Sequence, residues 1–222
     1  MHRRVVATLL LAVSLCQLAC HAQFRRFARR ASGVETAAVI RASPTVDLTV
    51  EGKGRSRKAK TRAEALRRAA AGVAARRMSA RVRRRMVEAL DPKSLRGVVE
   101  ERLGEELRDK LPFGERQDQA DGLLRLRVTR YGLVNGPDGL AFLARLRGSL
   151  YRASDDRRIY DESVTCRKGG LYAGNPRSSL RRTAAAVAFA KSLAAEQLKR
   201  RVEQMLKVCT SKLVDKMQKH AS

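Results

Sequence analysis

Alternating apolar and polar positions dominate the stretch from Asp121 to Cys166. In the first run the apolar positions are Leu124, Leu126 and Val128, and the positions between them are Arg125, Arg127 and Thr129. In the second run the apolar face collects Leu140, Phe142, Ala144, Leu146 and Leu150, and the other face carries Arg145 and Arg147. A period of two residues is typical of strands with one buried face. With a weaker third run from Arg158 to Cys166, and turn residues at 135–139 and 154–157, the pattern predicts an antiparallel meander.

Helical periodicity flanks the predicted meander on both sides. Thr61, with Glu64 three residues later, has the spacing of a capping box and begins a helix over about 61–90. Asp91 followed by proline begins a second helix over about 93–111. A last helix over about 178–217 would be about 60 Å long if straight, so we expect a break or a projecting, coiled-coil-like end.

These elements predict an α+β fold. The sheet is expected to be three- to four-stranded and mainly antiparallel, formed by the meander 121–166 with a possible edge strand at 45–50. The helices are expected to cover it, because a lone sheet must bury its apolar face. The predicted domain organisation is a signal peptide at 1–19, a basic tether at 20–43 and a single α/β domain with a long C-terminal helix at 44–222.

The first residues have the three-part pattern of a secretory signal peptide. A basic start at 1–4 precedes the apolar run from Val5 to Leu15, and small residues follow. The run is shorter than the roughly 20 residues that a membrane-spanning helix needs. One group of residues argues against easy export, because positive charge tends to stay on the cytoplasmic side: Arg25, Arg26, Arg29 and Arg30.

Two cleavage sites are compatible with this signal. Leu18-Ala19-Cys20 resembles the lipobox of bacterial lipoproteins, in which the cysteine becomes the lipidated first residue. The family has leucine where this chain has Gln17, and the rival interpretation is ordinary cleavage after Ala22. If Cys20 carries lipid, the resemblance implies outer-membrane attachment, because His21 and not aspartate follows it. The attachment would be a lipid anchor and not a spanning helix.

The charge of the chain favours an anionic partner. Its 222 residues include 48 Lys and Arg against 22 Asp and Glu, a net charge of +26. Such a chain attracts nucleic acid, anionic lipid or the phosphates of an envelope glycolipid. The alternative is that arginines distributed over every segment are solvated. The candidate anion ligands lie on the helix at 61–90, which could lie on an anionic membrane or pack on the sheet with its arginines in water. They are Arg76, Arg77, Arg81, Arg83, Arg84 and Arg85.

The sequence offers little for catalysis, and we expect no enzyme, no cofactor and no metal. The histidines are His2, His21 and His220, so a Ser-His-Asp arrangement has no suitable base. The four cysteines include no C-x-x-C pair, which argues against zinc. One acidic patch could provide paired carboxylates for an envelope hydrolase, or form ion pairs with Arg102, Arg108 and Lys110, the commoner arrangement. It contains Glu100, Glu101, Glu105, Glu106 and Asp109.

Cys166 and Cys209 are the cysteines in the body of the processed chain. An oxidising envelope would favour pairing them, and a disulfide needs Cα atoms within about 7 Å. In a straight helix, Cys209 would lie about 46 Å from the helix start, and the linker 167–177 spans at most about 40 Å. A bridge therefore requires a linker that runs back along the sheet or a broken helix. The alternative is two separate thiols.

The meander carries a resemblance to known proteins. Ala120-Asp121 followed by ARLRGSLYRASDDRRIYDESV resembles small bacterial envelope lipoproteins: the lipopolysaccharide-assembly lipoprotein LptE and the CsgG- and TolB-N-terminal-like domains. This resemblance implies an α/β sandwich that serves transport or assembly at the outer membrane without catalysis.

Three functions remain open from the sequence. The leading hypothesis is a non-enzymatic lipoprotein, attached to the outer membrane and facing the periplasm, that binds a partner protein or an anionic lipid or glycolipid. One alternative is a cytoplasmic basic protein that binds nucleic acid, against which stand the 4% aromatic content and the lack of a nucleic-acid motif. The second alternative is the carboxylate-dependent envelope hydrolase.

Overall fold

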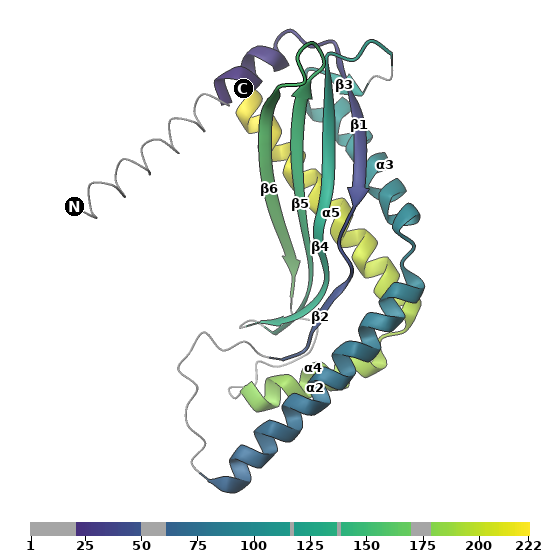
Figure 1. The fold of residues 1–222 in the computed structure, drawn as a ribbon, viewed down its shortest axis with the longest axis vertical. Helices are drawn as coiled ribbons and strands as arrows, with labels where there is room; N and C mark the ends of the chain where they lie inside the picture. The colour runs from purple at the N-terminus through teal and green to yellow at the C-terminus, as the bar shows by residue number, and fades with distance from the viewer. Residues whose placement is uncertain (1–20, 50–60, 116–117, 137–138, 170–178) are drawn as a thin grey trace, which may run out of the picture.

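The computed structural model of the chain describes residues 21–49, 61–115, 118–136, 139–169 and 179–222. The predicted signal peptide and Cys20 lie outside these residues. Figure 1 shows a curved sheet with the long helices on one side. The strands are β1 (Gly33–Ile40), β2 (Thr45–Asp47), β3 (Gly114–Glu115), β4 (Gly122–Gly136), β5 (Gly139–Arg152) and β6 (Arg158–Lys168). The helices labelled in Figure 1 are α2 (Arg62–Ala89), α3 (Pro92–Lys110), α4 (Ser179–Ser192) and α5 (Ala195–Ala221).

The predicted meander is confirmed as β4, β5 and β6, which pair antiparallel in sequence order. Val128 lies opposite Leu146, and Leu124 lies opposite Leu150. These apolar side chains point to the face that the helices cover, where they are completely buried. The period of two residues therefore identified the buried face of the meander correctly.

The sheet is larger than predicted and it is mixed. Within the described residues it has six strands in the order β3-β1-β4-β5-β6, with β2 paired to β4 beside this path. Both β1 and β2 run parallel to β4. The α+β class is therefore confirmed, whereas the expected three- to four-stranded sheet is too small and lacks these parallel pairs. The physical reason is the crossover through α2 and α3, which returns the chain to the sheet in the same direction. Gly132 allows β2 to approach, because a Cβ there would meet the Thr45 carbonyl oxygen at 1.8 Å.

The predicted tether at 20–43 is also wrong where the structure describes it. Residues 21–28 form a helix, and residues 33–40 form β1, which pairs with β4 along most of its length. Phe24 is completely buried against the rings of Tyr160 and Phe113, with centroid distances of 4.5 and 6.3 Å. This aromatic packing fixes the N-terminal helix to the end of the sheet.

The predicted helix starts and the break in the last helix are confirmed. The Thr61 hydroxyl accepts a hydrogen bond from the backbone N–H of Glu64 at 3.1 Å, and the Asp91 carboxylate accepts from Lys93 and Ser94. Between α4 and α5 the helix stops at residues 193–194. There the Gln197 side chain accepts a hydrogen bond from the backbone of Ala194, which stabilises the new helix start.

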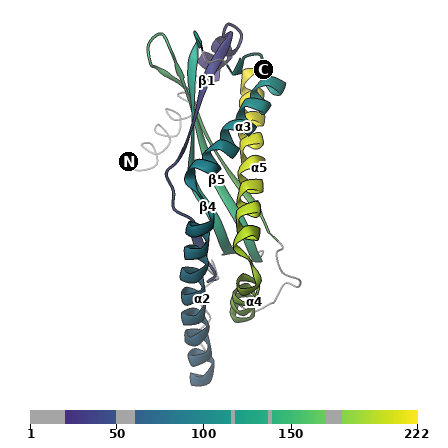
Figure 2. The same ribbon diagram turned by 90° about the vertical axis from the view of Figure 1, so that its right-hand side faces the viewer.

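The helices lie on one face of the sheet. Figures 1 and 2 show α3 and α5 along this face, whereas α2 and α4 continue past the end of the strands. We call the face that they cover the covered face. α5 approaches β5 closely, because a Cβ on Gly148 would meet the Leu213 side chain at 2.8 Å. No described helix is both long enough and apolar enough to span a bilayer.

The break also resolves the geometry of the two cysteines. It lets α5 run back along β5 and β6, so that Cys209 faces the end of β6. The structure joins Cys166 and Cys209 in a disulfide with Cα atoms 5.5 Å apart, and both residues are buried. Oxidation of this pair in the protein isolated from cells stays a prediction.

Candidate functional site

The sheet face opposite the helices is rich in arginine. No helix of the described residues covers this face, and the strands turn one set of arginines toward it. We call this set the arginine face: Arg125, Arg127, Arg130, Arg145 and Arg147. Arg127 lies directly opposite Arg147, and Arg130 lies opposite Arg145 beyond an irregularity in the pairing. Like charges directly opposite one another destabilise a sheet, so this face carries a cost that an anionic ligand would relieve.

Some of this charge is neutralised by a neighbouring strand. Nε of Arg147 donates to Oδ1 of Asp161 on β6 at 2.7 Å, and Arg158 lies 3.1 Å from the same carboxylate. The hydrogen bond from Arg147 lowers the pKa of Asp161 below its ordinary value, although partial burial opposes this effect. The Arg125 guanidinium lies 5.0 Å from the centroid of the Tyr151 ring, a cation–π contact.

Positive charge nevertheless remains in excess on this face. Among the described residues, no ion pair is recorded for Arg127, Arg130 or Arg145. Arg130 and Arg145 are exposed, and Arg127 is half-buried. Guanidinium groups bind phosphate oxygens in a bidentate manner. The arrangement can therefore bind a molecule that carries several phosphates.

The arginines predicted as anion ligands on α2 differ in their exposure and contacts. Arg85 is half-buried, and its Nη1 donates to the Leu193 carbonyl at the break between α4 and α5, 3.3 Å away. Arg85 therefore has a structural contact, and its role as an anion ligand stays a prediction. The other candidates are exposed along α2: Arg76, Arg77, Arg81, Arg83 and Arg84.

The buried apolar side chains of α2 lie mainly in its second half. Met78, Val82 and Met86 are buried, whereas Leu66 in the first half is 65% exposed. The reason is that the start of α2 extends beyond the end of the strands (Figure 2).

The acidic patch of α3 forms ion pairs. Arg102 pairs with Glu105 and Glu106, and Lys110 pairs with Glu106 and with Asp215 of α5. Burial by itself raises the pKa of Glu106. Hydrogen bonds from Lys110 and from the Ser211 hydroxyl, together with the nearby positive charges, outweigh burial and lower this pKa overall. These carboxylates link α3 to α5, and no group of metal-ligand type gathers among the described residues.

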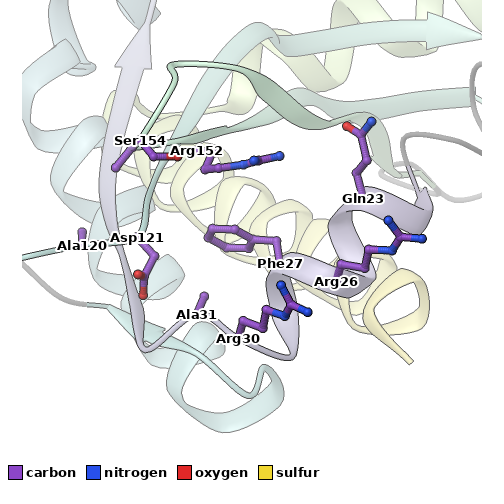
Figure 3. Close-up of a pocket in the computed structure, with 10 residues that line it drawn as sticks. Gln23, Arg26, Phe27, Arg30, Ala31, Ala120, Asp121, Arg152 and Ser154 are labelled. Carbon is purple, nitrogen blue, oxygen red and sulfur yellow. The ribbon is translucent and has the colours of Figure 1, made fainter.

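A second basic surface lies at the end of the sheet where the N-terminal helix packs. Figure 3 shows this cleft, which has a volume of about 650 Å³. We call it the N-terminal cleft. It is lined by Gln23, Arg26, Phe27, Arg30, Ala31, Ala120, Asp121, Arg152, Ala153 and Ser154. The Phe27 ring lies in the middle of the view, with Arg152 on one side and Arg26 and Arg30 on the other.

The carboxylate of the N-terminal cleft is already engaged. Oδ2 of Asp121 accepts hydrogen bonds from the backbone N–H of Ser32 at 2.6 Å and from its hydroxyl at 2.9 Å. It also accepts a longer one from the N–H of Gly33, at 3.4 Å. Asp121 thus fixes the turn that follows the N-terminal helix, and the guanidinium groups of the cleft remain available for a ligand.

The sequence contained a signal for the arginine face but not for the cleft. Arginines at 125, 127, 145 and 147 flank a turn at 135–139, and this symmetry would have predicted that Arg127 faces Arg147. The cleft depends on the docking of residues 21–28, which were predicted to form a tether.

Comparisons with known proteins give partial structural similarity. Neither a protein-family model nor a curated protein matches the sequence. A Xanthomonas campestris protein of the family DUF330 has a TM-score of 0.37 at 19% identity, covering 56% of this chain and 61% of its own length. A candidate lipoprotein from Caulobacter crescentus has a TM-score of 0.31 at 15% identity, covering 56% of this chain and 81% of its own. Lipoprotein GNA1162 from Neisseria meningitidis has a TM-score of 0.23 at 16% identity, covering 39% and 54%.

Proposed function

We propose that this chain is a non-enzymatic envelope lipoprotein that binds a phosphorylated envelope glycolipid through the arginine face. The observation that carries this proposal is the sheet face that no described helix covers, on which Arg127 lies opposite Arg147 and Arg130 opposite Arg145. A ligand with several phosphates would place negative charge between these pairs. Binding would then remove the repulsion that the free protein contains.

The proposed location follows from the N-terminus. The apolar run to Leu15 and the sequence Leu18-Ala19-Cys20 support export and lipidation at Cys20. His21 after the cysteine supports the outer membrane, with the folded domain in the periplasm. A lipid anchor would hold the arginine face close to the membrane surface, where anionic headgroups are concentrated.

Binding to lipid A tests the proposed function. The full chain, purified in a non-ionic detergent, is titrated with lipid A in the same detergent, and phosphatidylcholine serves as the neutral lipid. Arg127→Gln with Arg145→Gln removes two charges from the arginine face and leaves the Arg147–Asp161 pair intact. Arg83→Gln with Arg84→Gln removes two exposed charges from α2 and is the matched control.

We expect about tenfold weaker binding for the first variant, because each hydrogen bond to a charged group contributes about 1.5–3 kcal/mol and some of this is recovered from the remaining arginines. The control should change the affinity by less than about twofold, because exposed charges at a distance are screened by salt. Equal losses in both variants would show that general basicity, and not the arginine face, binds the ligand.

The anchor has a separate test. The intact mass of the protein isolated from membranes should correspond to a chain that begins at a lipidated Cys20, and Cys20→Ser should remove it from the membrane fraction. An unmodified N-terminus at Gln23 would show ordinary cleavage. Recovery of unprocessed protein in the cytosol, bound to nucleic acid, would favour the nucleic-acid alternative.

A further inference from the structure

We propose that the N-terminal cleft binds the phosphate headgroup of an anionic glycerophospholipid from the leaflet that holds the lipid anchor. This site is separate from the arginine face, and it relies on the proposed function for the position of the anchor alone. Guanidinium groups, an apolar floor and the distance to Cys20 each support this assignment.

The charge of the cleft fits a phosphate. Arg26 and Arg30 come from the N-terminal helix and the turn after it, whereas Arg152 comes from the end of β5. Among the described residues no ion pair is recorded for Arg26 or Arg30, and Arg152 approaches Asp155 at 3.6 Å with both side chains at least 40% exposed. An exposed pair at this distance contributes little. These arginines are therefore free to bind phosphate oxygens from two sides.

The size and floor of the cleft fit a lipid headgroup. A volume of about 650 Å³ lies within the range of small-molecule sites. Phe27 and Ala31 provide an apolar surface for the glycerol and the first carbons of the acyl chains. Gln23 provides an amide that can hydrogen-bond to a headgroup hydroxyl. Phe27 is itself held in place, because its ring packs edge-on against Phe113 with centroids 5.8 Å apart.

The position of the cleft selects a membrane lipid as the source of the phosphate. Gln23 is three residues from Cys20 in the sequence, so their Cα atoms lie at most about 11 Å apart. An acyl chain on Cys20 therefore brings the cleft to the membrane–water interface, where phospholipid headgroups are present at high local concentration. Binding a lipid there would orient the domain as well as hold it at the membrane.

Matched pairs of arginines in one segment make a sharp test. Arg26→Gln with Arg30→Gln removes two charges from the cleft. Arg25→Gln with Arg29→Gln removes two exposed charges from the same segment that do not line the cleft. The full chain, in non-ionic detergent, is titrated with a short-chain phosphatidylglycerol, and affinity is measured by calorimetry.

We expect the cleft variant to bind phosphatidylglycerol about tenfold more weakly, and the control variant to change by less than about twofold. Both should keep the thermal stability of the parent, because all of the changed side chains are exposed. Equal losses for the two variants would overturn the proposal in favour of diffuse attraction between charges.

The source of the phosphate is tested with soluble anions and with the arginine-face variant. Inorganic phosphate should bind at least about tenfold more weakly than phosphatidylglycerol, because it lacks the contacts to Phe27 and Ala31. Equally tight binding of inorganic phosphate would overturn a lipid site. Arg127→Gln with Arg145→Gln should leave phosphatidylglycerol binding unchanged, whereas the cleft variant should leave lipid A binding unchanged. A failure of the phospholipid site in the cleft can then be distinguished from a failure of the glycolipid site on the arginine face.

Discussion

The two faces of the meander differ although they belong to the same strands. On the covered face Leu124, Leu126 and Leu146 are completely buried under the helices. One residue further along each strand, Arg127 and Arg147 face each other without a helix over them. Burial of each leucine stabilises the fold by about 1.5–3 kcal/mol, whereas the opposed arginines destabilise it slightly.

The covered face therefore stabilises the fold, whereas the arginine face is the proposed binding surface. The covered face is complete in the folded chain, because its side chains have all their contacts there. In the proposed function, an anionic ligand completes the contacts of the arginine face. Substitutions on the covered face should therefore change the free energy of unfolding, whereas substitutions on the arginine face should change ligand affinity.

Removal of the disulfide should have the largest effect on stability. Replacing Cys166 and Cys209 with serine opens a link between residues 43 positions apart that joins β6 to α5. In the loop-entropy model this costs about 4 kcal/mol of unfolding free energy. Denaturant titration of the double variant and of the oxidised parent measures this cost. Alkylation of the unfolded, unreduced parent is the control: labelling of both cysteines would exclude the bridge.

Leu146→Ala should be the next largest change, and Arg145→Ala is its counterpart on the opposite face. The leucine is completely buried, so its truncation should cost about 3 kcal/mol. The arginine is exposed, so its removal should change stability by less than about 0.5 kcal/mol. Denaturant titration measures both values. Similar losses for the two variants would mean that the arginine face also belongs to the packed core.

Glu106→Gln tests the ion pairs that hold α3 and α5 together over the covered face. The loss of a buried carboxylate that binds Lys110 and Ser211 should cost about 2 kcal/mol at neutral pH. The pKa of Glu106 is lower in the folded state than its ordinary value of 4.5. Its stabilising contribution is therefore present above about pH 4.5 and is lost as the pH falls below it.

Measurement of the unfolding free energy between neutral pH and about pH 3 checks this prediction. The parent should lose more stability than the variant over this range, because the glutamine does not titrate. Parallel curves for the two proteins would exclude Glu106 as a source of the acid sensitivity.

Asp161→Asn should have the smallest effect on stability, below about 1 kcal/mol, because its ion pair with Arg147 is partly exposed. The pKa of Asp161 is also lowered in the folded state, so the pair stabilises at neutral pH and the contribution fades in acid. The change releases Arg147 from its carboxylate. The affinity for lipid A should therefore rise by about twofold in the titration in detergent described above. A fall in this affinity would contradict a binding role for the arginine face.

The two faces of the meander show which features the alternation of apolar and polar residues could predict. Leu124 and Leu126 against Arg125 and Arg127 predicted both the strand and its buried side, because alternation is a property of neighbouring residues. The same pattern could not show that α3 and α5 leave the arginine face uncovered. It also could not show that Arg85 would donate to Leu193, a residue 108 positions later in the chain.

The sequence by itself determined the meander, the helix starts at Thr61 and Asp91, and the alternative of a break or a projecting end for the last helix. Each of these depends on interactions within a few residues, or on a helix length beyond the usual range of globular domains. Only the tertiary structure decided that residues 33–40 pair with β4, that the helix at 21–28 docks through Phe24, and that an arginine-lined cleft forms beside it. These features require contacts between distant segments, whose free energy depends on the packed shape of the whole domain and not on local periodicity.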